Sequence, residues 1–280
     1  MEQVERVWWL MEFWTIYILS LLAAGLASGF VAGLFGVGGG IVRIPIFLFL
    51  FPILGIHADV LMHVAAGTSL SLSIPSAIMA SRAQYKAGNL DLDFLKLWVP
   101  ALILGVLIGI FTMRYVTSRF LEQVFAFVIL IVSIQMFFTT SEFKITKEFP
   151  GVVIKALSAF LIGLISIMTG TAGGSFTTPT LTAFGYPIHR SIAVASAGGF
   201  FISIVGATGL AISGIGIHGR PHFSLGYIDL TAVLVMIVPI IIMAPLGVKL
   251  AVHTSQDRLR KVFSIFLFIV SLDMIRTLYF

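Results

Sequence analysis

Two glycine-rich stretches carry the clearest chemical signal in this sequence. The first, Gly36-Val37-Gly38-Gly39-Gly40, lies in a run without charged residues between Glu12 and Arg43. Hydrocarbon tolerates unpaired backbone N–H and C=O groups only where protein or a polar cavity covers them. A helix that restarts after the glycines would point its free N–H groups into such a cavity, and helix starts attract anions. The stretch therefore predicts noncovalent binding of a small anion.

The same pattern occurs a second time in the chain. Gly170-Thr171-Ala172-Gly173-Gly174 repeats the first stretch in the second half, and Pro179 follows it at the same spacing as Pro45 follows the first. Interrupted helices at matching places in two halves indicate a transporter site at a repeat interface. Small residues also let membrane helices pack closely, so a packing role is the alternative. Duplication and the following proline favour the binding interpretation.

Polar side chains surround both stretches. Arg43 either extends to the membrane interface and sets topology or supplies a fixed positive charge for the anion; its counterpart is Thr177. Thr68 and Ser69 lie in the middle of a span, where hydroxyls often bond back to their own helix. The predicted substrate-binding residues are Gly36, Gly38, Gly39, Gly40, Arg43, Thr68, Ser69, Gly170, Thr171, Gly173, Gly174, Ser175, Thr177 and Gly198.

No catalytic constellation accompanies these residues. The chain has no cysteine, no spacing typical of metal ligands, no nucleotide fingerprint and no nucleophile elbow. We therefore expect no enzymatic activity, no catalytic residue, no metal and no cofactor. The net charge of +5 is interpreted as loop topology rather than nucleic-acid binding. The expected partners are a small anionic substrate and the lipid bilayer, with no nucleic acid; the sequence does not define an oligomeric state.

The elements that hold these stretches are predicted to be membrane helices. Hydrophobic residues make up 59% of the 280 and charged residues only 10%, against about 25% charged in soluble domains. The predicted spans cover 13–35, 60–81, 97–113 and 123–141, then 156–189 with an interruption, 191–213, 230–248 and 262–280. Segment 41–54 would be about 21 Å long as a helix, short of a ~30 Å hydrocarbon core. It and segment 175–185 are predicted to be half-helices or re-entrant arms.

Matching residues indicate a duplicated unit. Asp91 falls on Asp229 and Gly109 falls on Gly247 when the second half is aligned on the first with one constant offset. We predict a first transmembrane repeat over 1–140, a linker over 141–151 and a second repeat over 152–280. Five segments in each half are an odd number, which gives the halves opposite orientations. The predicted fold class is an all-α integral membrane protein with two inverted repeats of four to five hydrophobic segments each, containing glycine-rich broken or re-entrant helices.

The basic residues predict the orientation. Ten lysines and arginines fall on one side of the predicted spans, and five arginines on the other. The positive-inside rule makes the richer side cytoplasmic and places both termini outside. We therefore expect a multi-pass protein of the cytoplasmic membrane.

The chain resembles the TauE/SafE sulfite-exporter family of membrane permeases, also called TSUP. The residues that carry the resemblance are Gly33 to Gly40 with Pro45, the segment Ala66-Gly67-Thr68-Ser69-Leu70, and Tyr85 to Gly88 before Asp91. The resemblance implies a transporter of small organic or inorganic anions, often sulfur oxyanions such as sulfite, thiosulfate or sulfonates. Two positions depart from the pattern of the family: Arg43, which is mostly apolar there, and Ala172, which interrupts the second glycine run.

Together these observations predict a secondary transporter for sulfur oxyanions or sulfonates such as sulfite, thiosulfate or sulfoacetate. Alternating access would come from one repeat rocking against the other. A passive anion channel is an alternative of the same general kind. A membrane enzyme and a non-transporting membrane subunit are alternatives of other kinds. The missing catalytic residues weigh against the enzyme, and the missing soluble domain weighs against the subunit.

Overall fold

A computed structural model of the chain describes residues 2–35, 39–138, 151–253 and 256–279. Two of the predicted site residues, Gly36 and Gly38, lie outside these ranges, as does most of the predicted linker 141–151. Within the described ranges the chain forms ten α-helices, one short 3-10 helix and one two-stranded ribbon. The all-α class predicted from composition is confirmed.

The two halves contain the same series of helices. The first half consists of α1 (Glu2–Phe35), α2 (Gly40–Ile53), η1 (Ala58–Val60), α3 (Leu61–Lys86), α4 (Leu92–Met113) and α5 (Ser118–Phe138). The second half consists of α6 (Gly151–Met168), α7 (Gly174–Ala183), α8 (Ile188–Ser213), β1 (Ser224–Leu225), β2 (Ile228–Asp229), α9 (Leu230–His253) and α10 (Gln256–Tyr279). In the described part, eight helices are long and apolar enough to cross a membrane. The other two, α2 and α7, have 14 and 10 residues.

Several helices extend beyond the spans predicted from hydropathy. Helix α1 begins at Glu2 rather than near residue 13, and α3 continues to Lys86 rather than ending near residue 81. Charged residues end the apolar stretch, but they do not end the helix, because backbone hydrogen bonds form with polar as well as with apolar side chains. Hydropathy therefore locates the part of a helix inside the membrane and not its ends.

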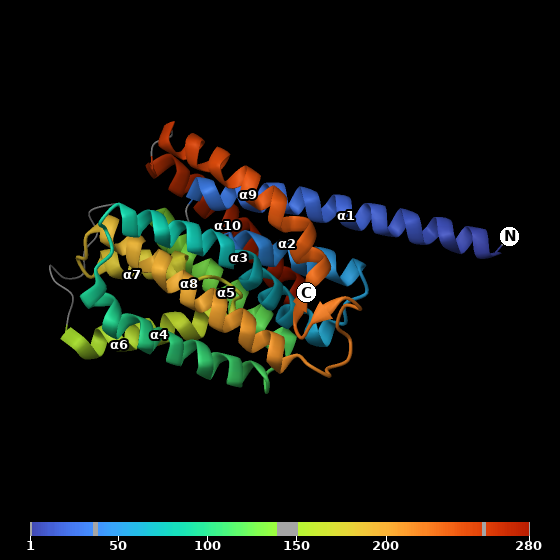
Figure 1. The fold of residues 1–280 in the computed structure, drawn as a ribbon, viewed down its shortest axis with the longest axis horizontal. Coiled ribbons are helices and arrows are strands. Elements are labelled where there is room, and N and C mark those ends of the chain that lie inside the picture. The colour runs from blue at the N-terminus through green and yellow to red at the C-terminus, as the bar shows by residue number, and fades with distance from the viewer. Residues whose placement is uncertain (1, 36–38, 139–150, 254–255, 280) are drawn as a thin grey trace.

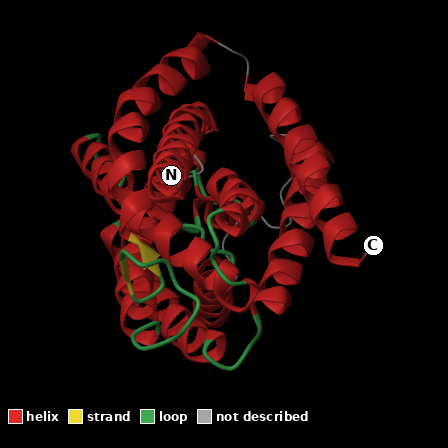
Figure 2. Ribbon diagram, turned by 90° about the vertical axis from the view of Figure 1, so that its right-hand side faces the viewer, coloured by secondary structure: helices red, strands yellow, loops and turns green. Residues whose placement is uncertain are grey.

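The halves run in opposite directions. Helices α1 and α6, which begin the two halves, start at opposite ends of the bundle (Figure 1). Helix α1 starts at the same end at which α10 finishes, and the ribbon β1–β2 lies at that end as well (Figure 2). This arrangement is the one expected of inverted repeats with an odd number of segments.

The helices of the two halves interleave. Helix α1 packs along α9, and α4 packs along α6. These pairs correspond to each other, because exchanging the halves turns α1 into α6 and α9 into α4. Helix α3 packs on α8 and α5 on α10, so each of these helices contacts its own repeat counterpart. A pseudo-twofold axis therefore passes between α3 and α8.

Glycines bring the interleaved helices into close contact. Gly25, Gly29 and Gly33 recur at every fourth position along the face of α1 that meets α9; a Cβ on Gly33 would lie 2.0 Å from the carbonyl oxygen of Ala244. In the corresponding pair, a Cβ on Gly105 of α4 would lie 2.0 Å from the backbone oxygen of a residue in α6. Small residues are what membrane helices use to approach this closely. The two tightest helix pairs therefore each contain one helix from each half.

Candidate functional site

The capping glycines of the two restarting helices have the same backbone conformation. Gly39 precedes α2 with φ 70° and ψ −12°, and Gly173 precedes α7 with φ 73° and ψ −6°. This left-handed region is one that glycine adopts without steric penalty. Each glycine carbonyl accepts the first helical hydrogen bonds, at 3.0 Å from the backbone nitrogen of Arg43 and at 2.9 Å from that of Thr177. The duplication seen in the sequence is therefore also a duplication of backbone geometry.

The two breaks lie against each other at the centre of the bundle. A Cβ on Gly40 would lie 3.0 Å from the Cα of Thr171 and 3.1 Å from the carbonyl oxygen of Gly170. The hydroxyl of Ser69 on α3 donates a hydrogen bond of 2.8 Å to the same carbonyl of Gly170. The start of α2 thus lies against the loop before α7, and α3 is hydrogen-bonded to the same loop. Since the pseudo-twofold relation exchanges the two loops, their contact lies close to its axis.

Arg43 lies inside the protein beside this contact and does not extend to the membrane interface. Its side chain is 1% exposed. The guanidinium Nε donates to the hydroxyl of Ser69 at 3.4 Å, and Nη2 donates to the hydroxyl of Ser73. The Ser73 hydroxyl in turn donates to the backbone oxygen of Ser69 at 2.9 Å. A positive charge is therefore held next to both loops by the serines of α3.

The second half places hydroxyls, rather than a charge, around its break. Ser166 on α6, Ser175 and Thr177 on α7, and Ser203 on α8 are all at most 5% exposed. None of these four hydroxyl oxygens has a hydrogen-bond partner in the described part of the chain. A Cβ on Gly173 would lie 2.9 Å from the Ser166 hydroxyl, which places that hydroxyl beside the start of α7. A buried polar group without a partner costs about 1–3 kcal/mol, so these four hydroxyls call for an explanation.

Two of the predicted site residues point elsewhere. The hydroxyl of Thr68 accepts a hydrogen bond of 3.0 Å from the backbone nitrogen of Asp229, at the start of α9. Gly198 faces α4: a Cβ there would lie 3.3 Å from Leu102 and 3.8 Å from Nε1 of Trp98. The structure therefore gathers Gly39, Gly40, Arg43, Ser69, Gly170 and Thr171 around one contact, and Gly173, Ser175 and Thr177 around the start of α7.

Sequence reasoning did not identify four buried polar residues, Ser73, Ser166, Ser203 and Trp98. Ser73 lies one helical turn after Ser69, so both lie on one helix face, and this spacing was a usable signal. Ser203 matches Ser73 at the same offset that relates Ala195 of α8 to Ala65 of α3. Ser166 and Trp98, whose indole N–H is also buried without a partner in the described ranges, had no comparable signal.

Asp91 and Asp229 serve as helix caps. Asp91 caps the start of α4, where its side chain accepts from the backbone nitrogen of Phe94 at 2.9 Å. Asp229 caps the start of α9 and accepts from the backbone nitrogens of Thr231 and Ala232 at 2.9 and 3.1 Å. No group of three or more His, Cys, Asp or Glu residues that would suit a metal ion occurs in the part of the chain that the structure describes.

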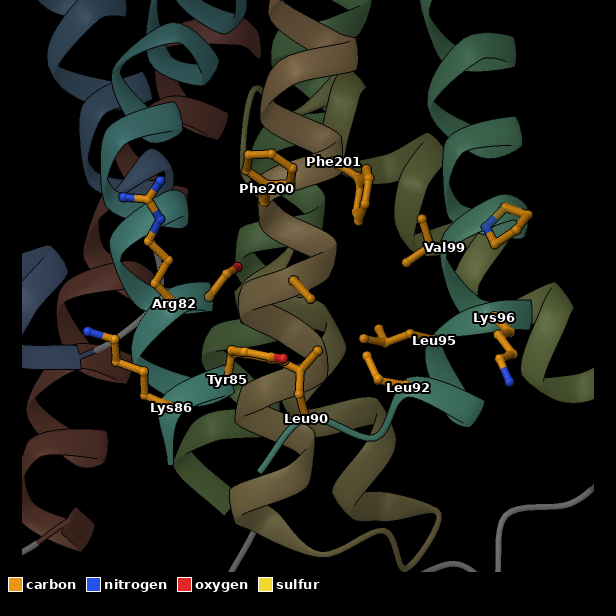
Figure 3. A pocket seen from close by; sticks show the side chains of 13 residues that line it. Arg82, Tyr85, Lys86, Leu90, Leu92, Leu95, Lys96, Val99, Phe200 and Phe201 are labelled. Carbon is orange, nitrogen blue, oxygen red and sulfur yellow. The ribbon is translucent and has the colours of Figure 1, made fainter. Parts of the chain in front are cut away.

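One cavity, a groove of about 930 Å³, lies between α3, α4 and α8, and its lining contains no residue of the glycine loops. Apolar side chains, namely those of leucine, valine, phenylalanine, proline and alanine, form most of its wall (Figure 3). Arg82 and Lys86 lie at its edge on α3, and their charged ends extend away from the leucine and phenylalanine side chains (Figure 3). Because few polar groups face its interior, the groove is a poor site for a small anion. The paired helix breaks are the better candidate.

Inverted repeats that meet at two broken helices are an architecture of secondary transporters. The family model "Sulfite exporter TauE/SafE" matches residues 21–274, and the chain belongs to this family of membrane transporters. A probable membrane transporter protein of Haemophilus influenzae is 31% identical over 92% of this chain and 98% of its own length. One of Methanocaldococcus jannaschii is 27% identical over 95% of this chain and 98% of its own length. No solved structure gives a significant match.

Proposed function

We propose that this chain is a secondary transporter of small anions, in particular sulfur oxyanions or sulfonates such as sulfite, thiosulfate or sulfoacetate. The observation that carries the proposal is the contact between the glycine-capped start of α2 and the loop that leads to the glycine-capped start of α7, next to the buried Arg43. Helix starts present unpaired N–H groups and a positive dipole end, both of which favour an anion. The name of the matching family, which refers to sulfite, supports the class of substrate.

The interleaved packing suggests how alternating access would occur. Movement of one sequence half against the other would separate α1 from α9 and α4 from α6, which pack through glycine contacts. We therefore propose that α1 moves with α9 and α4 moves with α6, so that each moving unit contains helices from both halves. This differs from the rocking of one repeat against the other that the sequence suggested. The movement would open the glycine loops to each side of the membrane in turn.

A binding screen tests the class of substrate. The purified full chain is heated with sulfite, sulfate, thiosulfate, sulfoacetate or acetate, and the apparent Tm is recorded. A ligand that binds the native state stabilises it by about 2.7 kcal/mol at a hundred times its Kd. We expect sulfur anions, and not acetate, to raise the Tm. A shift with acetate alone would contradict the proposed substrate class.

Transport assays separate a carrier from a passive anion channel. The chain is reconstituted in liposomes, and uptake of the anion selected by the screen is followed with and without an imposed ion gradient. We expect accumulation above the external concentration when the gradient is present. Uptake that only equalises the two concentrations would favour the channel.

The two capping glycines give the sharpest mutational test. Gly39→Ala and Gly173→Ala each place a Cβ on a residue with positive φ, at 3.0 Å from the Cβ of Ala32 and at 2.5 Å from Cδ1 of Ile202 respectively. The strain is roughly 1–2 kcal/mol per residue, so we expect the variants to be produced but to lose transport. Lys249→Ala, an exposed position on α9, is the control and should transport normally. Wild-type transport by both glycine variants would show that the loops serve packing only.

The orientation proposed for the membrane has its own test. We propose that both termini are extracytoplasmic, with the polar segment 141–150 in the cytoplasm, as the positive-inside rule indicates for the distribution of lysines and arginines over the whole chain. Alkaline phosphatase fused after Phe280 should then be active, and the same enzyme inserted within 141–150 should be inactive. The reverse pattern would overturn this orientation.

A further inference from the structure

We infer that the anion binds on one side of the pseudo-twofold axis only, among the unpartnered hydroxyls of Ser166, Ser175, Thr177 and Ser203, and that the side chain of Arg43 occupies the corresponding place in the first half. This inference rests on the proposed function, because it identifies where the transported anion is held. It also goes beyond the duplicated pattern, which by itself predicts two equivalent half-sites.

The correspondence of residues across the halves carries the first step. Arg43 corresponds to Thr177, because each lies four positions after its capping glycine, and Ser73 corresponds to Ser203 in the paired helices α3 and α8. In the first half the guanidinium of Arg43 donates to the hydroxyl of Ser73 across the contact between α2 and α3. In the second half α7 packs on α8 in the same way, but Thr177 is several atoms shorter than arginine. Its hydroxyl and that of Ser203 have no partner in the described ranges.

The second step concerns the number of hydrogen-bond donors. The hydroxyls of Ser166 and Ser175 add to those of Thr177 and Ser203, and all four residues are at most 5% exposed. The described first half leaves no serine or threonine hydroxyl buried without a partner. The hydroxyls of Ser69 and Ser73 in the first half are therefore engaged by Arg43, whereas these four hydroxyls of the second half are left for a ligand.

The charge distribution identifies the ligand as an anion. The hydroxyls of Ser175 and Thr177 lie in the first turn of α7, where the positive end of the helix dipole and the free backbone N–H groups disfavour a cation. The positive charge of Arg43 lies across the contact between the loops, linked through the hydroxyl of Ser69 to the carbonyl of Gly170. A small oxyanion, which accepts several hydrogen bonds at once, matches these neutral donors and the nearby charge.

Single cysteines test the asymmetry directly, because the natural chain contains none. Ser203→Cys and Ser73→Cys form a matched pair of repeat counterparts. Both variants in membranes are treated with 2-sulfonatoethyl methanethiosulfonate, a small sulfonate that forms a disulfide with an accessible thiolate and releases methanesulfinate. The cationic trimethylammonium-ethyl reagent is the control for charge.

We expect the sulfonate to modify Ser203→Cys faster than Ser73→Cys by roughly tenfold, a difference of about 1.4 kcal/mol. The cationic reagent should modify Ser203→Cys more slowly than the sulfonate does, and thiosulfate should protect this position. Equal rates at the two positions, a preference for the cationic reagent, or no modification of Ser203→Cys would overturn the inference. If Ser203→Cys does not yield folded protein, Ser175→Cys serves as the reporter with the same expectations.

The outcomes for site and function are separable. Selective modification of the second half without uptake of any anion in liposomes would leave the anion site in place and reject the transport function. Uptake with equal modification of both positions would keep the transport function and reject the one-sided site.

Discussion

Asp91 and Asp229 occupy corresponding positions, since each caps the start of its helix, α4 or α9, but their surroundings differ. Asp91 accepts a hydrogen bond of 2.7 Å from the hydroxyl of Tyr186 and lies 3.7 Å from the guanidinium of Arg190, with a quarter of its side chain exposed. Asp229 is 1% exposed and accepts 2.8 Å from the hydroxyl of Tyr17. Duplication has thus preserved the backbone cap, while the second carboxylate oxygen of each residue has acquired different partners.

This difference follows from the inverted arrangement. The start of α4, beside Arg190, lies at one end of the bundle, and the start of α9, directly after strand β2, lies at the opposite end (Figure 1). One cap therefore takes part in a charged surface network, and the other links α9 to α1 through Tyr17 and to α3 through Thr68. We expect the buried Asp229 cap to contribute more to the free energy of unfolding than the partly exposed Asp91 cap.

The largest effect is expected from Asp229→Ala. The change removes a helix cap, worth about 0.5–2 kcal/mol, and leaves the buried hydroxyl of Tyr17 without an acceptor, at about 1–3 kcal/mol. The free energy of unfolding, measured by denaturant titration in mixed micelles, should fall by about 2–4 kcal/mol when these ranges are combined. Asp229→Asn keeps the cap and should retain most of the stability. Equal losses in the two variants would show that charge, rather than capping, dominates at this position.

A smaller effect is expected from Asp91→Ala. The lost cap should lower the unfolding free energy by about 1 kcal/mol, because water can replace the contacts of the partly exposed Tyr186 and Arg190. Tyr186→Phe, which removes only the hydroxyl, should lower it by less. The same titration in micelles provides the measurement. A loss for Asp91→Ala as large as that for Asp229→Ala would remove the proposed distinction between the two caps.

The smallest and most selective effect concerns pH. The hydroxyl of Tyr186, the backbone N–H of Phe94 and the nearby Arg190 and Lys155 hold the pKa of the Asp91 carboxyl below its ordinary value. Its stabilisation is therefore present above the ordinary aspartate pKa, near 3.9, and is lost as the pH falls through the lowered value. The deficit in apparent Tm of Asp91→Asn relative to wild type should shrink on acidification.

Asp229 should respond to pH in the opposite direction. Burial raises the pKa of its carboxyl, against the opposing hydrogen bonds from Tyr17, Ala232 and Thr231. Its favourable contribution is full below the ordinary pKa and is lost as the pH rises through the raised value. Any deficit in the apparent Tm of Asp229→Asn relative to wild type should therefore shrink as the pH rises from about 4 toward neutrality. If the Tm deficits of Asp91→Asn and Asp229→Asn changed with pH in the same direction, this account would be contradicted.

The sequence predicted the parts of this structure that depend on local chemistry. Glycines within apolar stretches located both breaks. Gly39 and Gly173 have positive φ, a conformation that glycine adopts more readily than other residues, so their role as helix caps was predictable from residue type. The sequence offsets between matching residues identified which positions of the two halves correspond, so the inverted arrangement could also be predicted from the sequence. The orientation of Thr68 toward Asp229 was not accessible, because a hydroxyl in a helix can bond to its own turn or to a neighbour, and spacing does not decide between them. The interior position of Arg43 depends in the same way on Ser69 and Ser73, which only the fold brings within reach.

The pairing of α1 with α9 also affects the order in which the chain assembles during synthesis. Helix α4 ends at Met113 and its partner α6 begins at Gly151, so these two helices can meet soon after they leave the ribosome. Helix α1 ends at Phe35, whereas its partner α9 begins only at Leu230, after most of the chain has been made. At about 5–20 residues per second, α1 waits on the order of ten to forty seconds before its glycine face is covered. During that interval lipid or an insertion factor must shield this face, and the first half expressed alone would retain it uncovered.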